Sequence, residues 1–115
     1  MDLGLQGKVA LVTACSGGLG AAVAHQLAKE GCRLVLFSRN EEKLKALSQE
    51  LQTLYHSTVS VVSGDMTKEA DLVVLKNHLK QHFGGLDLLI LNTGRPPLKM
   101  KTVMQETDML SLIHI

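Results

Sequence analysis

The chain has 115 residues, of which 45% are hydrophobic and 20% charged, and its formal net charge is +1; these proportions are typical of a single globular domain. One tyrosine, two phenylalanines and no tryptophan leave few rings for base stacking, and the dispersed basic residues show no clear excess, so we expect no nucleic-acid partner. No apolar run approaches the roughly 20 residues of a membrane span, so we expect no membrane contact. No signal-peptide pattern is visible, and the two cysteines fit neither a disulfide framework nor a zinc pattern, so we expect a cytoplasmic protein.

Short apolar runs alternate with helical periodicity along the chain. Mostly apolar runs bounded by turn residues are typical of strands buried on both faces of a sheet. Four such runs are present, at residues 9–12, 34–37, 59–62 and 86–91. Between them, apolar residues spaced three or four apart predict three helices. The expected apolar stripes are Leu19, Ala22, Val23 and Leu27; Leu44, Leu47, Leu51 and Leu54; and Leu72, Leu75, Leu79 and Phe83.

Turn residues mark the ends of these elements. Gly31 and the glycine pair at 84–85 are expected to end the first and third helices, while Ser38 and Asn40 both fit the N-cap of the second. Residues 92–97 are expected to form a loop. The polar-to-apolar stretch that follows is expected to be a last helix running to the end of the chain.

The alternation of strands and helices predicts the α/β class. We expect a doubly wound, Rossmann-type parallel sheet with right-handed crossovers, in which about four strands lie in the order 3-2-1-4. No linker or repeat interrupts residues 1–115, so a single domain is expected. A full sheet of this type continues beyond its fourth strand, which suggests that the chain is truncated within the domain. Strand 4 would then be an exposed edge, and the isolated chain would be poorly stable or self-associating.

A glycine-rich segment, residues 13–20, joins the first strand to the first helix. It carries three glycines within four residues, at 17, 18 and 20. In doubly wound sheets this segment lies beyond the carboxyl ends of the strands, where ligands bind. Glycine permits positive φ and a close approach of phosphate, and the following helix directs free N–H groups at the ligand. The segment therefore predicts the pyrophosphate site of a nucleotide cofactor.

The glycine spacing discriminates between classes of nucleotide-binding protein. A P-loop requires Lys followed by Ser or Thr after its last glycine, whereas Ala21 follows Gly20 here. The G-x-G-x-x-G/A fingerprint fits poorly, because Val23 stands at its last position. A methyltransferase that binds S-adenosylmethionine would normally carry an acid at the end of the second strand, where Ser38 and Arg39 stand.

At this point the sequence resembles the short-chain dehydrogenase/reductase family. The family motif T-G-x-x-x-G-x-G is matched by Thr13, Gly18 and Gly20, with Ala14 in place of its first glycine. The extended branch of the family, which includes sugar epimerases, uses T-G-x-x-G-x-x-G. Thr13, Gly17 and Gly20 satisfy that motif too, so the loop alone does not separate the branches.

Two later segments favour the short-form branch, which includes 3-oxoacyl-carrier-protein reductases. Residues 65–67 resemble the family's D-[VM]-[TS] turn, and residues 91–94 resemble N-N-A-G with Leu91 and Thr93 as departures. The resemblance implies that Asp65 contacts the adenine, and that Asn92 and Gly94 lie beside the cofactor.

The end of the second strand bears on the choice between NAD and NADP. A carboxylate there would bind the ribose 2′-hydroxyl of NAD, whereas an arginine accepts the 2′-phosphate of NADP. The acidic position is taken by Ser38, and Arg39 follows it. Since Arg binds phosphate through paired charge-assisted hydrogen bonds, we expect NADP, with NAD the less favoured cofactor.

The candidate site is therefore a cofactor site without a metal. Its expected members are Thr13, Cys15, Ser16, Gly18, Leu19, Gly20, Ser38, Arg39, Asp65, Met66, Asn92 and Gly94. His78 and His82 have the i, i+4 spacing of a metal pair, but no third ligand is apparent, and zinc needs three or four.

The resemblance implies a small-molecule carbonyl or alcohol substrate and a homo-oligomeric full-length enzyme. Family members react through a Tyr-x-x-x-Lys pair and a Ser, usually assisted by an Asn. The sole tyrosine here, Tyr55, is followed at +4 by Val59, so it is not that catalytic residue, and we expect the chain alone to be inactive. The leading hypothesis is the N-terminal cofactor-binding part of an NADP-dependent short-chain oxidoreductase. The alternative is a non-catalytic nucleotide-binding or regulatory protein.

Overall fold

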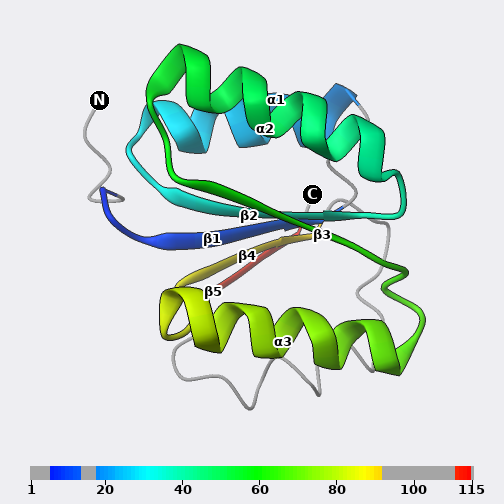
Figure 1. Cartoon of the computed structure of the whole chain (residues 1–115). Coiled ribbons are helices and arrows are strands. Elements are labelled where there is room, and N and C mark those ends of the chain that lie inside the picture. The colour runs from blue at the N-terminus through cyan, green and yellow to red at the C-terminus, as the bar shows by residue number, and fades with distance from the viewer. Residues whose placement is uncertain (1–5, 14–17, 92–110, 115) are drawn as a thin grey trace.

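The computed structural model describes residues 6–13, 18–91 and 111–114, and it has the expected α/β architecture (Figure 1). Strands and helices alternate along the chain up to the fourth strand. The elements in chain order are β1 (Val9–Thr13), α1 (Gly18–Lys29), β2 (Arg33–Ser38), α2 (Glu41–Tyr55), β3 (Val59–Ser63), α3 (Glu69–Phe83), β4 (Leu88–Leu91) and β5 (Ser111–His114).

The strands form one parallel sheet in the order β3-β2-β1-β4-β5. The predicted order 3-2-1-4 is confirmed. One register row runs across the whole sheet, because neighbouring strands pair through Val61, Leu36, Val12, Ile90 and Ile113. All carboxyl ends therefore lie on one edge of the sheet, called the carboxyl edge below, and all amino ends on the opposite edge.

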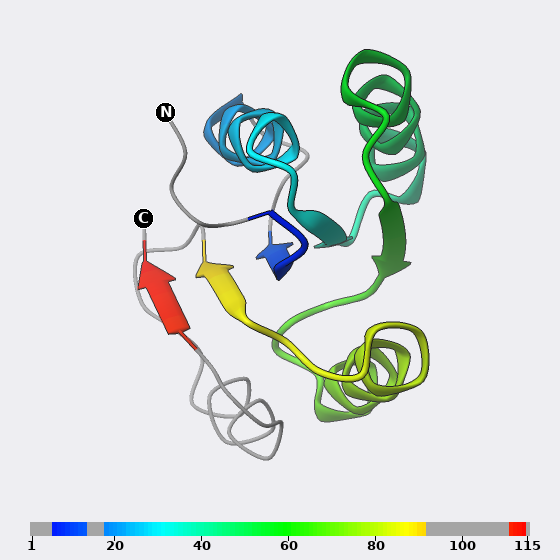
Figure 2. The same ribbon diagram turned by 90° about the vertical axis from the view of Figure 1, so that its left-hand side faces the viewer.

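Helices cover both faces of the sheet (Figures 1 and 2). Because successive strand residues point to opposite faces, the even-numbered residues of β1 and β2 pack toward α1 and α2, and the odd-numbered ones toward α3. β1 is buried at every position, which explains its continuous apolar run. The predicted doubly wound arrangement is thereby confirmed.

The helices follow the predicted ranges, but two of the expected apolar faces differ in detail. Leu19 is 55% exposed and Leu54 58% exposed, although both were expected in buried stripes. Leu27 is buried as expected, but α1 also buries Ala24 and Ala28. The buried face of α1 is therefore rotated from the expected one toward its two alanines.

Of the two expected N-caps of α2, Asn40 is the one observed. Its side-chain oxygen accepts a hydrogen bond from Lys43 N at 3.1 Å, which satisfies one of the free donors of the first helical turn. Ser38 instead ends β2 and accepts a hydrogen bond from Asn40 N at 3.3 Å. The chain therefore passes from β2 to α2 through two residues, Arg39 and the N-cap Asn40.

The end of the chain departs from the prediction. Residues 111–114, expected in a helix, form the strand β5, which pairs with β4 in parallel. β4 is therefore not the exposed edge that was expected, and the described residues form a sheet of five strands rather than about four. The polar-to-apolar stretch misled the prediction because a four-residue strand is too short for a periodic signal. The expected loop at 92–97 lies outside the described residues.

None of the helices within the described ranges combines the length and the apolar character that a membrane span needs.

Candidate cofactor-binding site

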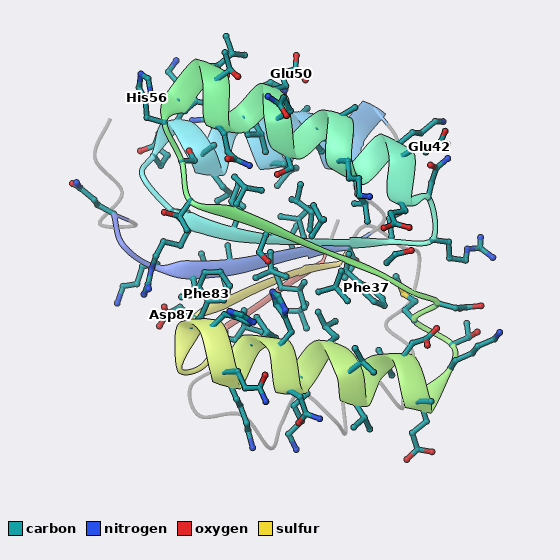
Figure 3. All side chains as sticks on the ribbon, in the orientation of Figure 1. Phe37, Glu42, Glu50, His56, Phe83 and Asp87 are labelled. Atoms are coloured by element: carbon teal, nitrogen blue, oxygen red, sulfur yellow. The ribbon has the colours of Figure 1, made fainter. Side chains whose placement is uncertain are left out.

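Three segments of the predicted site meet at the carboxyl edge of the sheet. β1 is followed by the start of α1, β2 by Arg39, and β3 by the turn that contains Asp65. In Figure 3 the labelled Phe37 and Glu42 lie toward this edge, whereas His56, Phe83 and Asp87 lie toward the opposite one. The carboxyl edge of a doubly wound sheet is where such folds bind their ligands.

The start of α1 provides hydrogen-bond donors. α1 begins at Gly18, and the first N–H groups of a helix have no partner within it. No acidic residue lies in its first turn, whereas α2 carries Glu41 and Glu42 in the same place. Among the described residues outside α1, no atom lies within 4 Å of a Cβ built on Gly18, so these residues leave room for a ligand at this point. An anion such as a pyrophosphate fits this helix end.

Thr13 ends β1, and its side chain contacts the neighbouring strand β4. Its side chain is buried, and its Oγ1 donates a hydrogen bond to Ile90 O at 3.2 Å. The residue therefore ties the end of β1 to β4 and steadies the strand from which the glycine segment departs. That Thr13 itself contacts a cofactor stays a prediction.

The end of β2 carries a buried serine followed by an exposed arginine. Ser38 is 9% exposed, and its carbonyl oxygen accepts a hydrogen bond from Gly64 N at 3.0 Å. Arg39 is exposed at the carboxyl edge. A long cationic side chain at this point can reach a phosphate on a ribose bound along the edge. The last residue of β2 is a serine, so no carboxylate stands there to repel that phosphate.

The segment after β3 forms a tight turn around Asp65. Its Oδ1 accepts hydrogen bonds from Thr67 N at 2.9 Å and from Thr67 Oγ1 at 2.7 Å, and Lys68 N donates to Asp65 O at 3.0 Å. The side-chain and backbone hydrogen bonds from Thr67, followed by the positive charges of Arg39 and Lys68, hold the pKa of the Asp65 carboxyl below its ordinary value of 3.8. Asp65 therefore carries a negative charge near the positive charge of Arg39.

Two residues of this region were missed in the sequence. Asp71, in the first turn of α3, accepts a hydrogen bond from Asp65 N at 2.8 Å. Gly64 packs so closely that an added Cβ would lie 2.9 Å from the Phe37 ring and 3.1 Å from Asp71 Cβ. The signal in the sequence was a glycine directly before the turn and an acid six residues after Asp65, at the start of a predicted helix.

The remaining predicted site residues divide into two groups. Leu19 is exposed in the first turn of α1, and Met66 is half-buried against the core between the sheet and α3; Gly20 is buried in α1. The predicted members Cys15, Ser16, Asn92 and Gly94 lie outside the described residues. The structure brings together the other members, at α1, at the end of β2 and at the turn after β3.

Tyr55 lies away from this edge. It ends α2, where its hydroxyl and His25 Nδ1 are 3.0 Å apart, and His25 Nε2 is 3.3 Å from Glu50 Oε2. His56 directly after it lies toward the opposite side in Figure 3. Within residues 6–13, 18–91 and 111–114, no group of three or more His, Cys, Asp or Glu side chains is placed to hold a metal ion.

Comparison with known proteins identifies the family. The family model described as short chain dehydrogenase matches residues 8–115. A farnesol dehydrogenase of Aedes aegypti is 35% identical over 104 residues, which make up 90% of this chain and 39% of that protein. An 11-beta-hydroxysteroid dehydrogenase of Pinus massoniana is 34% identical over 90 residues, or 78% of this chain and 25% of that protein.

Solved structures agree with the sequence relatives. L-sorbose reductase from Gluconobacter frateurii, solved with NADPH and L-sorbose, matches with a TM-score of 0.78 and 34% identity, over 83% of this chain and 36% of that one. An alcohol dehydrogenase from Thermococcus sibiricus, solved with 5-hydroxy-NADP, matches with a TM-score of 0.73 and 29% identity, over 77% of this chain and 38% of that one. The chain thus spans less than half the length of these relatives. Fold, motifs and comparisons agree, and the chain belongs to the short-chain dehydrogenase family.

Proposed function

We propose that this chain is the N-terminal, cofactor-binding part of an NADP-dependent oxidoreductase that acts on a carbonyl/alcohol pair. The observation that carries the proposal is the meeting of three features at the carboxyl edge. These are the acid-free start of α1, the exposed Arg39 after β2 and the Asp65 turn after β3. The reductase and dehydrogenase structures solved with NADPH or an NADP derivative support the same cofactor.

Each feature suits one part of NADP. The N–H groups at the start of α1 would hold the pyrophosphate. Arg39 would hold the 2′-phosphate through charge-assisted hydrogen bonds, with Ser38 beside it. Asp65 would accept a hydrogen bond from the adenine amine. When bound, the cofactor supplies or accepts a hydride at its nicotinamide ring.

The chemistry on the substrate would come from residues outside this chain. The sole tyrosine lacks a lysine four residues on, and its hydroxyl is engaged with His25 at 3.0 Å. We therefore expect the 115-residue chain to bind NADP without reducing a carbonyl compound. The proposal for the whole enzyme includes a small-molecule carbonyl or alcohol substrate, a homo-oligomeric state and a cytoplasmic location.

The cofactor assignment is tested by an Arg39→Asp variant. The new carboxylate would repel the 2′-phosphate of NADP and could bind the free 2′-hydroxyl of NAD. We expect the ratio of NADP to NAD affinity to fall by about 10- to 100-fold, since hydrogen bonds to charged groups contribute about 1.5–3 kcal/mol. Both affinities can be measured by isothermal titration calorimetry.

Lys8→Asp is the matched control. Lys8 is exposed directly before β1, at the amino edge of the sheet, so this variant makes the same change of net charge far from the proposed site. Its ratio of affinities should equal that of the wild type. An Arg39→Asp variant with the wild-type ratio would contradict the assignment of the 2′-phosphate to Arg39.

A further inference from the structure

The turn after β3 is held from the helix that follows it. Asp71 Oδ2 accepts the hydrogen bond of Asp65 N at 2.8 Å, across six positions of the chain. Asp71 belongs to the first turn of α3, whose residues Leu72, Leu75 and Leu79 are fully buried against the sheet. The carboxylate of Asp71 is therefore anchored to the core, and it fixes the backbone of Asp65 relative to the sheet.

The same turn has little room to settle differently. Gly64 N donates to Ser38 O at 3.0 Å, which ties the end of β3 to the end of β2. Phe37 and Asp71 both lie within 3.1 Å of the position that a Cβ on Gly64 would take. The close packing at Gly64 and the hydrogen bond from Asp65 N to Asp71 therefore both restrict the backbone that leads into Asp65.

The carboxylate of Asp65 is oriented by this arrangement. Both hydrogen bonds from Thr67 end on Oδ1, so the described residues of the turn do not occupy Oδ2. One carboxylate oxygen is thus committed to the turn, and the other is available at the carboxyl edge. Because hydrogen bonds weaken steeply with angle, the direction of Oδ2 decides how well it accepts a hydrogen bond from a ligand.

We propose that Asp71 is a positioning residue, which aligns the Asp65 carboxylate with the adenine amine of the cofactor. This inference rests on the proposed function, because it requires an adenine nucleotide at the carboxyl edge. Asp71 itself acts through the backbone of Asp65. Its contribution is therefore specific to the adenine amine and separate from the binding of the phosphates.

The test compares two ligands that differ at that amine. NADPH carries the N6 amine, and reduced nicotinamide hypoxanthine dinucleotide phosphate carries an oxygen in its place. Partial unfolding lowers the apparent affinity for both ligands by the same factor. The ratio of the two affinities, measured by calorimetry, therefore reports the alignment of Asp65 even in a variant that is less stable.

We expect the wild-type chain to prefer NADPH by about fivefold, equivalent to about 1 kcal/mol for one hydrogen bond. Asp71→Ala should reduce this preference to nearly none. Asp71→Asn should restore it, because the amide oxygen can still accept the hydrogen bond of Asp65 N. Glu69→Ala is the matched control, since it removes another acid from the first turn of α3 and should leave the preference unchanged.

The other outcomes separate the two claims. A wild-type chain that binds neither nucleotide contradicts the proposed function, and this inference with it. A wild-type chain that binds both equally, an Asp71→Ala variant with the wild-type preference, or an equal loss in Glu69→Ala overturns the role of Asp71 and leaves the cofactor assignment standing.

Discussion

Gly64 and Gly18 show how one residue type serves two purposes in this chain. At Gly64 the missing Cβ lets β3 pass the Phe37 ring, since an added atom would lie 2.9 Å from it. At Gly18 an added atom would meet no described residue outside α1 within 4 Å. The first glycine is required by packing within the protein, whereas the open space at the second suits a ligand.

We therefore expect the same substitution to affect stability at one glycine and cofactor binding at the other. Gly64→Ala should lower the free energy of unfolding by about 1–3 kcal/mol, as overpacking a tight site does. Gly18→Ala should change it by less than about 0.5 kcal/mol, but should weaken NADPH binding by placing a methyl group where the pyrophosphate approaches. Urea denaturation and calorimetry measure the two effects, and a Gly64→Ala variant as stable as wild type would refute the packing argument.

At this scale, part of the site could be predicted from the sequence. Arg39 and Asp65 are recognisable because they lie one and two residues after the ends of β2 and β3, and position in the chain alone brings them to one edge. Asp71 was missed because its contact with Asp65 N depends on how the turn folds back on α3. The exposure of Leu19 and Leu54 was also missed, since periodicity does not say how far around a helix its neighbours reach.

At the scale of elements, a histidine cluster joins α3 to the edge strand β3. His78 Nε2 lies 2.6 Å from Ser60 Oγ, and the rings of His78 and His82 are 4.4 Å apart. Burial, and then the neighbouring charge of His82, lower the pKa of His78 below its ordinary value of 6.5. Both effects therefore favour the neutral form of His78.

This cluster predicts a loss of stability in acid. The unfolded chain protonates His78 near pH 6.5, but the folded chain protonates it only at lower pH. The unfolded state therefore binds more protons as pH falls below 6.5, and stability should decrease from there through the pKa of the folded state. His78→Gln keeps a hydrogen-bonding partner for Ser60 and removes the titration, so it should flatten this decline.

Urea midpoints measured on either side of pH 6.5 provide the readout. His56→Asn is the matched control: His56 is exposed, and its left-handed backbone, with φ of 56°, is tolerated by asparagine. The control should keep the wild-type pH dependence. An equally steep decline in His78→Gln would rule out His78 as its source.

The sequence predicted the first four strands well and the fifth not at all. β1, β2 and β4 are mostly apolar runs within one sheet, and such runs are strong local signals. β5 has four residues, and its place in the sheet comes from pairing with β4. Non-local pairing of this kind leaves little trace in a short segment.

For the whole molecule, the parallel sheet separates two edges with different roles. The carboxyl edge gathers the start of α1, Arg39 and the Asp65 turn. At the amino edge the contacts serve the fold: Asp87 Oδ2 accepts a hydrogen bond from Val9 N at 2.8 Å, and Arg33 lies over the Phe83 ring. The labelled Phe83 and Asp87 lie at the far side of Figure 3 from Phe37.

The central claim is that NADP binds along the carboxyl edge, and mapping of backbone amides by nuclear magnetic resonance tests it most directly. On titration with NADPH, the amide signals of residues 18–21, 39–40 and 65–68 should shift together at one affinity. Those of residues 31–33 and 84–87, at the opposite edge, should stay in place. Shifts confined to the amino edge, or no shifts at saturating NADPH, would contradict the account.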